Sequence, residues 1–196
     1  MSNAQSPKLN TFQQVRELPK KRALAFSAAL LERMWINYQL FCELNEYGDP
    51  IQAKNLINLL WEYVKAPKAK INCTVQSEKI EEITPDITDF DNYGVFPALD
   101  FCMGLQVALQ IVADEEPSGA VMIAKLSQGG TEAYINATEE VELTGVDLKQ
   151  HELMQFEIAI QQYLVELSQS KPIDLDSFKA FLTDELVSNI GLSAKV

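Results

Sequence analysis

The sequence predicts an all-α protein: a single compact helical domain, residues 1–196, of about seven or eight helices around a central apolar helix at about 96–113. Apolar residues recur at steps of three and four in most segments, and no stretch alternates convincingly as a strand does. Pro, Asp and Gly stand where helices would start and stop. No linker or internal repeat divides the chain, so one domain is expected, with residues 1–10 as candidates for disorder.

The N-terminal third predicts a short leading helix followed by a helical hairpin. The first long helix begins at Pro19 and ends near Gly48, a residue suited to the left-handed conformation at a helix end. Asp49 and Pro50 have the pattern of an N-cap and a first turn, and the amphipathic pattern continues to Val64. The apolar stripe of the first long helix consists of Leu24, Ala28, Leu31, Trp35, Tyr38 and Cys42.

The middle of the chain predicts a helix, a turn and then the central helix. A weaker helical pattern at 71–83 is followed by 89–94, where Asp, Asn and Gly favour a turn. The helix at about 96–113 is apolar nearly all round, which is typical of a helix in the middle of a bundle. Asp100 is one of its few polar residues, and Gly104 would let a neighbouring helix approach closely.

Two adjacent glycines, Gly129 and Gly130, predict an interruption in the next helical region. Each costs about 1 kcal/mol relative to Ala inside a helix. A break or kink is therefore expected between helical segments at 120–126 and 131–137.

The C-terminal part predicts two further helices. Asp147 is expected to cap a long one that carries apolar residues at helical spacing. The last helix should start near Asp174 or Asp176 and stop at Gly191. The connections are short, which favours an orthogonal or bundle-like arrangement.

The net charge of −12 is distributed unevenly. Residues 1–70 hold ten Lys and Arg against six Asp and Glu, a net charge of +4, so residues 71–196 have a net charge of −16. Non-specific nucleic-acid binding depends on Lys and Arg neutralising phosphates. No nucleic acid is therefore expected to bind through the acidic surface. The uneven charge favours a cationic partner, or docking of the basic N-terminal helices on the acidic remainder.

Three features predict a cytoplasmic location. No apolar run approaches the roughly 18 residues of a membrane span. The first ten residues, MSNAQSPKLN, lack the charged and apolar regions of a signal peptide. The cysteines Cys42, Cys73 and Cys102 form no CxxC motif and have apolar neighbours, which is typical of reduced, buried thiols. We therefore expect no membrane partner and no cofactor.

The strongest candidates for chemistry are four carboxylates, Asp86, Asp89, Asp91 and Asp100. Hard cations such as Mg²⁺ prefer clustered oxygen ligands, but the spacing matches no established metal motif. Turns and helix caps explain the first three without any function. Asp100 differs because it lies early in an apolar helix, where a buried carboxylate must be paired, hydrogen-bonded or protonated. It is either a structural group, stabilised by the helix N-terminus and a nearby Lys, Arg or Tyr, or a ligand-binding or catalytic one.

Other catalytic patterns are incomplete. Ser127 follows Lys125 by two residues, but neither G-x-S-x-G nor S-x-x-K is present at this serine. The chain has one histidine, His151, so HExxH zinc chemistry is excluded. Rossmann and P-loop glycine patterns are also absent.

Four blocks of the sequence resemble a known family: NYQLFCELNEYGDP at 37–50, AKINCTVQSEKIEEITPD at 69–86, DFDNYGVFPALD at 89–100 and AKLSQGG at 124–130. Together they resemble the YjaG-like bacterial proteins grouped as domain of unknown function 416 (DUF416). Ile36 stands where such proteins often have Pro, which weakens the case for a helix break there. The resemblance implies an all-helical cytoplasmic bacterial protein and brings no established activity. It singles out for testing Asn37, Tyr38, Gly48, Asp91, Tyr93, Gly94, Asp100, Ser127 and Gln128.

Two classes of function remain open. The lack of a complete catalytic constellation and the charge of −16 on residues 71–196 favour a non-enzymatic domain that binds another protein or itself, for example as a homodimer. The alternative is a small-molecule or divalent-metal-dependent enzyme that uses carboxylates near Asp89, Asp91 and Asp100. No catalytic or metal-ligating residue is assigned. The candidates for binding a ligand or partner are Asn37, Tyr38, Asp89, Asp91, Tyr93, Asp100, Ser127 and Gln128.

Overall fold

The computed structural model describes residues 9–66, 68–184 and 186–193, and in these ranges it is all-α, as predicted. One 3-10 helix, η1 (Ile87–Asp89), accompanies the α-helices. The disorder expected at 1–10 falls mostly on residues 1–8, which lie outside the described residues. The α-helices are α1 (Thr11–Arg16), α2 (Lys20–Asn45), α3 (Pro50–Lys65), α4 (Cys73–Ile83), α5 (Val95–Val112), α6 (Gly119–Thr138), α7 (Gly145–Gln150), α8 (Glu152–Gln169) and α9 (Leu175–Asp184).

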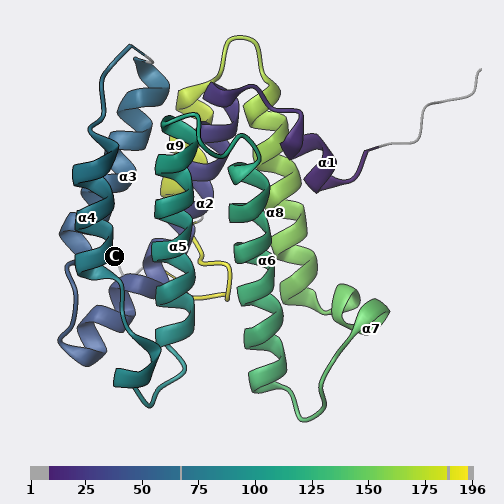
Figure 1. Cartoon of the computed structure of the whole chain (residues 1–196). Helices are drawn as coiled ribbons and strands as arrows, with labels where there is room; N and C mark the ends of the chain where they lie inside the picture. Colours follow the sequence, from purple (N-terminus) through teal and green to yellow (C-terminus); the bar gives the residue numbers. More distant parts are fainter. Residues whose placement is uncertain (1–8, 67, 185, 194–196) are drawn as a thin grey trace, which may run out of the picture.

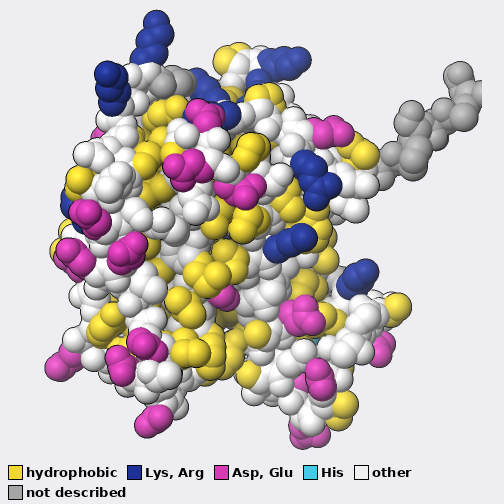
Figure 2. Space-filling view, viewed as in Figure 1, with side chains coloured by type: hydrophobic (Ala, Val, Ile, Leu, Met, Phe, Trp, Pro, Cys, Tyr) yellow, Lys and Arg dark blue, Asp and Glu magenta, His cyan; other side chains and the backbone are white. Residues whose placement is uncertain are grey.

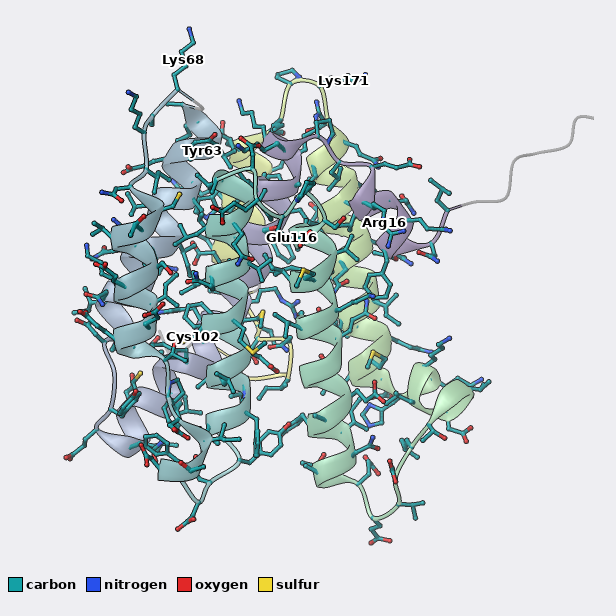
Figure 3. All side chains as sticks on the ribbon, in the orientation of Figure 1. Arg16, Tyr63, Lys68, Cys102, Glu116 and Lys171 are labelled. Carbon is teal, nitrogen blue, oxygen red and sulfur yellow. The ribbon has the colours of Figure 1, made fainter. Side chains whose placement is uncertain are left out.

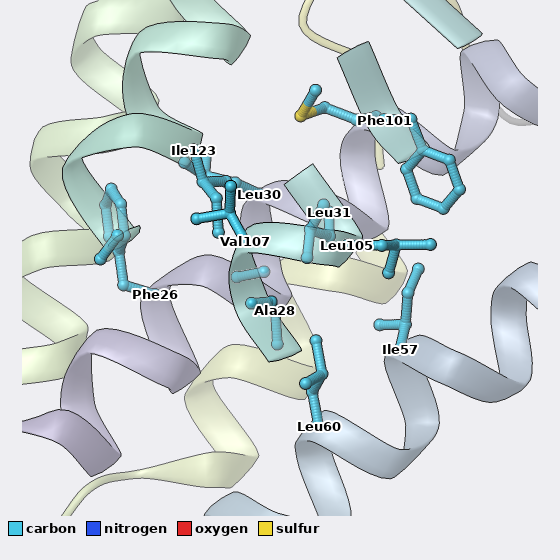
Figure 4. Close-up of a cluster of buried hydrophobic side chains, with 14 of the residues drawn as sticks. Phe26, Ala28, Leu30, Leu31, Ile57, Leu60, Phe101, Leu105, Val107 and Ile123 are labelled. Carbon is cyan, nitrogen blue, oxygen red and sulfur yellow. The ribbon is translucent and has the colours of Figure 1, made fainter. Parts of the chain in front are cut away.

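Helices α2 and α5 pack against each other at the centre of the bundle (Figure 1). Helix α2 runs unbroken through Ile36 and also contacts α3, α6, α8 and α9. Gly104 permits the close approach that the sequence predicts, since a Cβ there would lie 2.8 Å from Leu31 Cδ2. Full burial of one large apolar side chain stabilises a fold by about 1.5–3 kcal/mol. Figure 4 shows part of this core, including Leu30 and Leu31 from α2, Phe101, Leu105 and Val107 from α5, and Ile123 from α6.

The turn between α2 and α3 has the predicted signals. Asp49 caps α3, because its Oδ1 accepts a hydrogen bond from the Gln52 N–H at 2.8 Å. Helix α2 closes at Glu46 in the left-handed conformation (φ 51°), and Gly48 is left-handed as well (φ 73°). A Cβ at Gly48 would lie 2.4 Å from the Tyr38 hydroxyl, so glycine is required here for two reasons.

The central helix α5 packs among other helices, as predicted, but one side of it is exposed. Phe96 is 49% exposed and Met103 47% exposed, while the opposite side of α5 is buried. Helix α5 is also long and apolar enough to span a membrane, contrary to the estimate from the sequence, but it packs among α2, α4 and α6 as a core helix. The exposed Met103 lies next to α6.

The predicted break at Gly129 and Gly130 is wrong, because α6 runs through both. A Cβ on Gly129 would meet no atom within 4 Å. A Cβ on Gly130 would lie 3.1 Å from Asp100 Oδ2 and 3.2 Å from Asn189 Nδ2. Packing of α6 against α5 and α8 sustains the helix, and close approach rather than helix termination accounts for Gly130.

The long helix predicted after Asp147 is two helices, α7 and α8. His151 leaves the helical conformation (φ −61°, ψ 133°) between them. Its Nδ1 accepts a hydrogen bond from the Leu153 N–H at 3.2 Å, so the cap of α8 is His151 rather than Asp147.

The last helix ends at Asp184, well before the predicted stop at Gly191. Residues 186–193 form instead a C-terminal hook, in which Val187 and Ser193 make an isolated antiparallel bridge. Gly191 is left-handed (φ 82°) within this hook. In Figure 1 the hook passes behind the space between α5 and α6.

Candidate functional site

A buried network of polar side chains, the polar core, joins α2, α6, α8 and the hook. Arg33 Nη1 lies 2.5 Å from Glu157 Oε2, and both side chains are almost completely buried. Arg33 also donates to two backbone carbonyls of the hook, at 2.8 and 3.2 Å. The other carboxylate oxygen of Glu157 accepts from the Ser127 hydroxyl (2.6 Å) and from Gln161 Nε2 (2.8 Å). Both charged side chains of the pair thus have further hydrogen-bond partners in addition to each other.

Ser127 and Gln128 belong to this network rather than to an open catalytic site. Ser127 is fully buried, and Gln128 Nε2 donates to Gln161 Oε1 at 2.9 Å. Lys125 is exposed and forms no ion pair in the described part of the chain, and two residues along a helix point in very different directions. Ser127 and Lys125, whose pattern in the sequence is incomplete, therefore do not form a nucleophile beside a base.

Two asparagines form a relay next to the polar core. Asn189 Nδ2 donates to the Ser127 carbonyl at 2.9 Å, and Asn37 Nδ2 donates to Asn189 Oδ1 at 2.8 Å. Because a backbone carbonyl can only accept, Ser127 fixes the orientation of the Asn189 amide, which in turn fixes that of Asn37. Asn37 Oδ1 is left buried without a hydrogen-bond partner in the described ranges, and Asn37 is only 3% exposed.

Asn37 lines a pocket of about 460 Å³, the asparagine pocket, between α2, the start of α5, α6 and the hook. The Tyr93 and Tyr134 rings meet at its edge with their centroids 5.9 Å apart. Burial, together with the charge of Asp100, raises the pKa of Tyr93 to about 12. None of the residues lining the pocket is charged: they are Asn37, Leu40, Phe41, Leu44, Asn45, Asn92, Tyr93, Gly94, Pro97, Tyr134, Ile190 and Leu192.

A groove of about 330 Å³, the α5–α6 groove, lies between the two helices. Its apolar walls include Met103 and Met122, which are 47% and 43% exposed. Figure 2 shows apolar side chains gathered along this face of the molecule, where α5 and α6 lie side by side. The groove is lined by Asp100, Met103, Val107, Met122, Lys125, Leu126, Gly129 and Gly130.

Asp100 is the half-buried carboxylate of this groove. It makes no hydrogen bond and no ion pair with any residue in the described ranges, and Lys125 of the same groove does not pair with it. Burial raises its pKa to about 6. The sequence analysis considered a structural role in which the helix N-terminus and a nearby Lys, Arg or Tyr stabilise Asp100. Among the described residues, no such side chain pairs with it.

The other carboxylates singled out by the sequence do not join Asp100. Asp89 and Asp91 are exposed. Asp86 accepts from the Thr88 N–H (2.8 Å) and hydroxyl (2.7 Å), which lowers its pKa. Within the described ranges no three His, Cys, Asp or Glu side chains are grouped so that they could hold a metal ion.

Tyr38 and the cysteines are core residues. The Tyr38 hydroxyl donates to the Ile83 carbonyl at 2.9 Å. All three cysteines are free, Cys42 and Cys102 buried and Cys73 half-buried. Burial raises the pKa of Cys42 to about 11 and that of Cys102 to about 12, which makes both poor nucleophiles. Figure 3 shows Cys102 on the side of α5 that faces α4.

A larger pocket of about 620 Å³ lies between α3 and α9, but its central charges already have partners. Lys54 forms an ion pair with Glu32 and lies 4.6 Å from the centre of the Trp35 ring. The Trp61 Nε1–H donates to the same glutamate at 3.3 Å. The other charged residues that line this pocket are exposed, whereas Asp100 of the groove is half-buried and Asn37 Oδ1 of the asparagine pocket is buried.

Several residues of these sites were not identified from the sequence. Arg33 could have been identified, because it is a charged residue within the mostly apolar run ALAFSAALLERMW. Asn189, Tyr134 and Met122 gave no such signal, since their positions depend on contacts between segments far apart in the chain. The missed residues are Arg33, Glu157, Gln161, Asn189, Tyr134, Met103 and Met122.

Residues 10–193 match the model of a family described as "Protein of unknown function (DUF416)". An uncharacterised protein of Haemophilus influenzae is 37% identical over 175 residues, which cover 86% of this chain and 89% of the relative. The uncharacterised protein YjaG of Escherichia coli is 33% identical over 175 residues, with coverage of 86% and 89%. A crystal structure of a DUF416 family protein from Shewanella baltica superposes with a TM-score of 0.87 at 32% identity, covering 95% of this chain and 100% of that one.

Proposed function

The chain belongs to the DUF416 family, and we propose that it is a protein-interaction domain whose α5–α6 groove binds a segment of a partner protein carrying apolar side chains and one Lys or Arg. The observation that carries this proposal is Asp100, a carboxylate in an apolar groove without a partner of its own. A cationic side chain of the partner would supply the missing charge.

The apolar walls support a protein partner. Met103 of α5 and Met122 of α6 both line the groove, and both are exposed. Contiguous exposed apolar side chains mark interaction surfaces, and methionine adapts its shape to different partners. A groove between two helices suits an amphipathic helical segment, whose apolar residues recur at steps of three and four.

The charge of the protein supports a cationic segment. With a pKa of about 6, Asp100 is mostly ionised at neutral pH. Residues 71–196, which include both helices of the groove, have a net charge of −16. In Figure 2 acidic side chains predominate on the lower part of this face, whereas Lys and Arg lie mostly toward the upper end. The free cysteines are consistent with a cytosolic partner.

A phage-displayed peptide library selected on the wild-type protein tests this proposal. We expect selected peptides to share one Lys or Arg flanked by apolar residues at helical spacing. Their affinity should fall at least about tenfold for Asp100→Asn, the loss typical of a buried charged contact. Met122→Glu should also abolish binding, whereas the matched control Val146→Glu, at an exposed position on α7, should not. Peptides that bind Met122→Glu as tightly as wild type would refute the proposal.

Self-association is the other form of protein interaction. If a second copy of the chain occupies the groove, sedimentation will show a dimer that Met122→Glu dissociates and Val146→Glu does not. A monomer that binds the selected peptides identifies a different protein as the partner. The enzyme alternative has less support, because Asp89 and Asp91 are exposed. Among the described residues, Asp100 also belongs to no group of three or more His, Cys, Asp or Glu that could hold a metal ion.

A further inference from the structure

We propose that the asparagine pocket binds a neutral aromatic molecule through one hydrogen bond from an N–H or O–H group of that molecule to Asn37 Oδ1. This site is separate from the α5–α6 groove and does not depend on the protein-interaction function. Three properties of the pocket define the ligand: the unpartnered acceptor, the lack of charge and the aromatic walls.

The unpartnered acceptor requires a donor. Rotating the Asn37 amide by half a turn would place two oxygens against each other at Asn189, unless Asn189 turned as well. Turning Asn189 would then place its oxygen against the Ser127 carbonyl. Both alternatives cost a hydrogen bond, so the Asn37 amide keeps this orientation in the folded chain. Because Oδ1 is buried, a ligand in the pocket reaches it only when neighbouring side chains move aside. Buried polar atoms almost always have partners, and this one has none in the described ranges.

The lack of charge excludes ionic ligands. No Lys, Arg, Asp or Glu lines the pocket. A cation would find no carboxylate among the lining residues, and an anion would be repelled by Asp100, whose charge already acts on Tyr93. Transfer of an unpaired ion into such a pocket is strongly unfavourable, so the ligand is neutral.

The walls favour a flat aromatic body. Phe41, Tyr93 and Tyr134 line the pocket together with Pro97 and Ile190. Aromatic rings prefer stacked or edge-to-face contacts with other rings. At the rim, Asn92 Nδ2 donates to Asn45 Oδ1 at 2.7 Å, which ties the turn before α5 to the end of α2. A volume of about 460 Å³ lies in the range of small-molecule sites and accommodates a one- or two-ring compound of the indole or phenol class.

Indole and 1-methylindole form a matched pair of probes, because they differ in the single N–H that the proposal requires. In a ¹H–¹⁵N NMR titration of the full chain, indole should give saturable shifts at Asn37, Tyr93, Tyr134 and Ile190. 1-Methylindole should bind about fivefold more weakly, the effect of one net hydrogen bond. Asn37→Leu should lower the affinity for indole to that for 1-methylindole and leave the latter unchanged.

The aromatic walls have a matched control. Tyr134→Ala should weaken the binding of both probes. Tyr163→Ala should weaken neither, because it removes an exposed tyrosine that pairs with Phe181 and does not line the asparagine pocket. Met122→Glu should leave both affinities unchanged. A result against the proposed groove function is therefore distinguishable from a result against this pocket.

Three outcomes would each overturn the proposal: equal affinity for the two probes, chemical shift changes confined to other residues, or no binding of indole at millimolar concentration. The first comparison uses only the wild-type chain and does not depend on whether a variant folds.

Discussion

The two buried polar regions that meet at helix α6 differ in how completely their atoms are bonded. In the polar core, Arg33 and Glu157 bond each other, the hook, Ser127 and Gln161. On the neighbouring surface of α6, Asp100 approaches Gly130 without a hydrogen bond, and the Asn37 relay ends in a free acceptor. Folding explains the first region, because each charge there is compensated inside the chain. The second region has no such compensation among the described residues, and we propose that bound molecules supply it.

Breaking the polar core should have the largest effect. Arg33→Ala leaves the Glu157 carboxylate buried without its cation, so we expect a loss of about 3–5 kcal/mol in the free energy of unfolding. Chemical denaturation followed by circular dichroism measures this loss. The control is Glu139→Ala, which removes a partly exposed pair with His151. This variant should change the free energy of unfolding by at most about 0.5 kcal/mol. A loss below about 1 kcal/mol for Arg33→Ala would mean that the two regions do not differ as described.

Alanine substitutions at Gly129 and Gly130 compare an open position of α6 with the position next to Asp100 and Asn189. Gly129→Ala should stabilise α6 by about 0.5–1 kcal/mol, because its Cβ meets nothing. Gly130→Ala should be less favourable than Gly129→Ala by about 1–3 kcal/mol, since the Cβ presses on Asp100 and on the fixed Asn189 amide. Thermal and denaturant unfolding of the two variants measures the difference. Equal stability of the two would show that the carboxylate and the relay are not held against Gly130.

Asp100→Asn should stabilise the free protein. Burial raises the folded pKa above the ordinary value of 3.8, so the unfolded chain releases this proton at lower pH than the folded one. Below about pH 4 the Asp100 carboxyl therefore does not lower the free energy of unfolding. As the pH rises to about 6, it lowers that free energy progressively. Asp100→Asn should therefore be more stable than wild type by a margin that grows over this range. We expect the free energies of unfolding to differ by about 1–3 kcal/mol at pH 7.5. A variant less stable than wild type at pH 7.5 would indicate a structural partner for Asp100.

The smallest effect is expected at the groove surface. Met122 is 43% exposed, so Met122→Glu should change the free energy of unfolding by at most about 0.5 kcal/mol. The same variant is expected to abolish binding of selected peptides. A thermal unfolding scan checks the first part, and destabilisation by several kcal/mol would show that the groove belongs to the core.

The fold could be predicted where local signals determine it. Asp49 and Pro50 start α3 because a cap and a fixed φ act within one turn. The continuity of α6 could not be predicted, because it depends on packing at Gly130 that helix propensity does not describe. The end of α9 was missed for a similar reason: the hook is held by Arg33, more than 150 residues earlier in the chain.

The candidate site was predictable in part. Asp100 stands out because a carboxylate in an apolar helix is a local pattern. Ser127 was considered as a nucleophile or ligand-binding residue. Its hydroxyl instead donates a hydrogen bond to Glu157, 30 residues away on another helix. Asn37 came from the family resemblance, and its role in the relay depends on Asn189, which no sequence pattern connects to it.

The most direct measurement is the titration of the Asp100 carboxyl carbon by NMR in the free, full-length chain. An unpartnered, half-buried carboxylate should titrate with a pKa of about 6, and a bound peptide carrying Lys or Arg should lower that value. A pKa at or below the ordinary 3.8 in the free protein would contradict the central claim, because it would show that the chain already supplies Asp100 with a cation or hydrogen-bond donor.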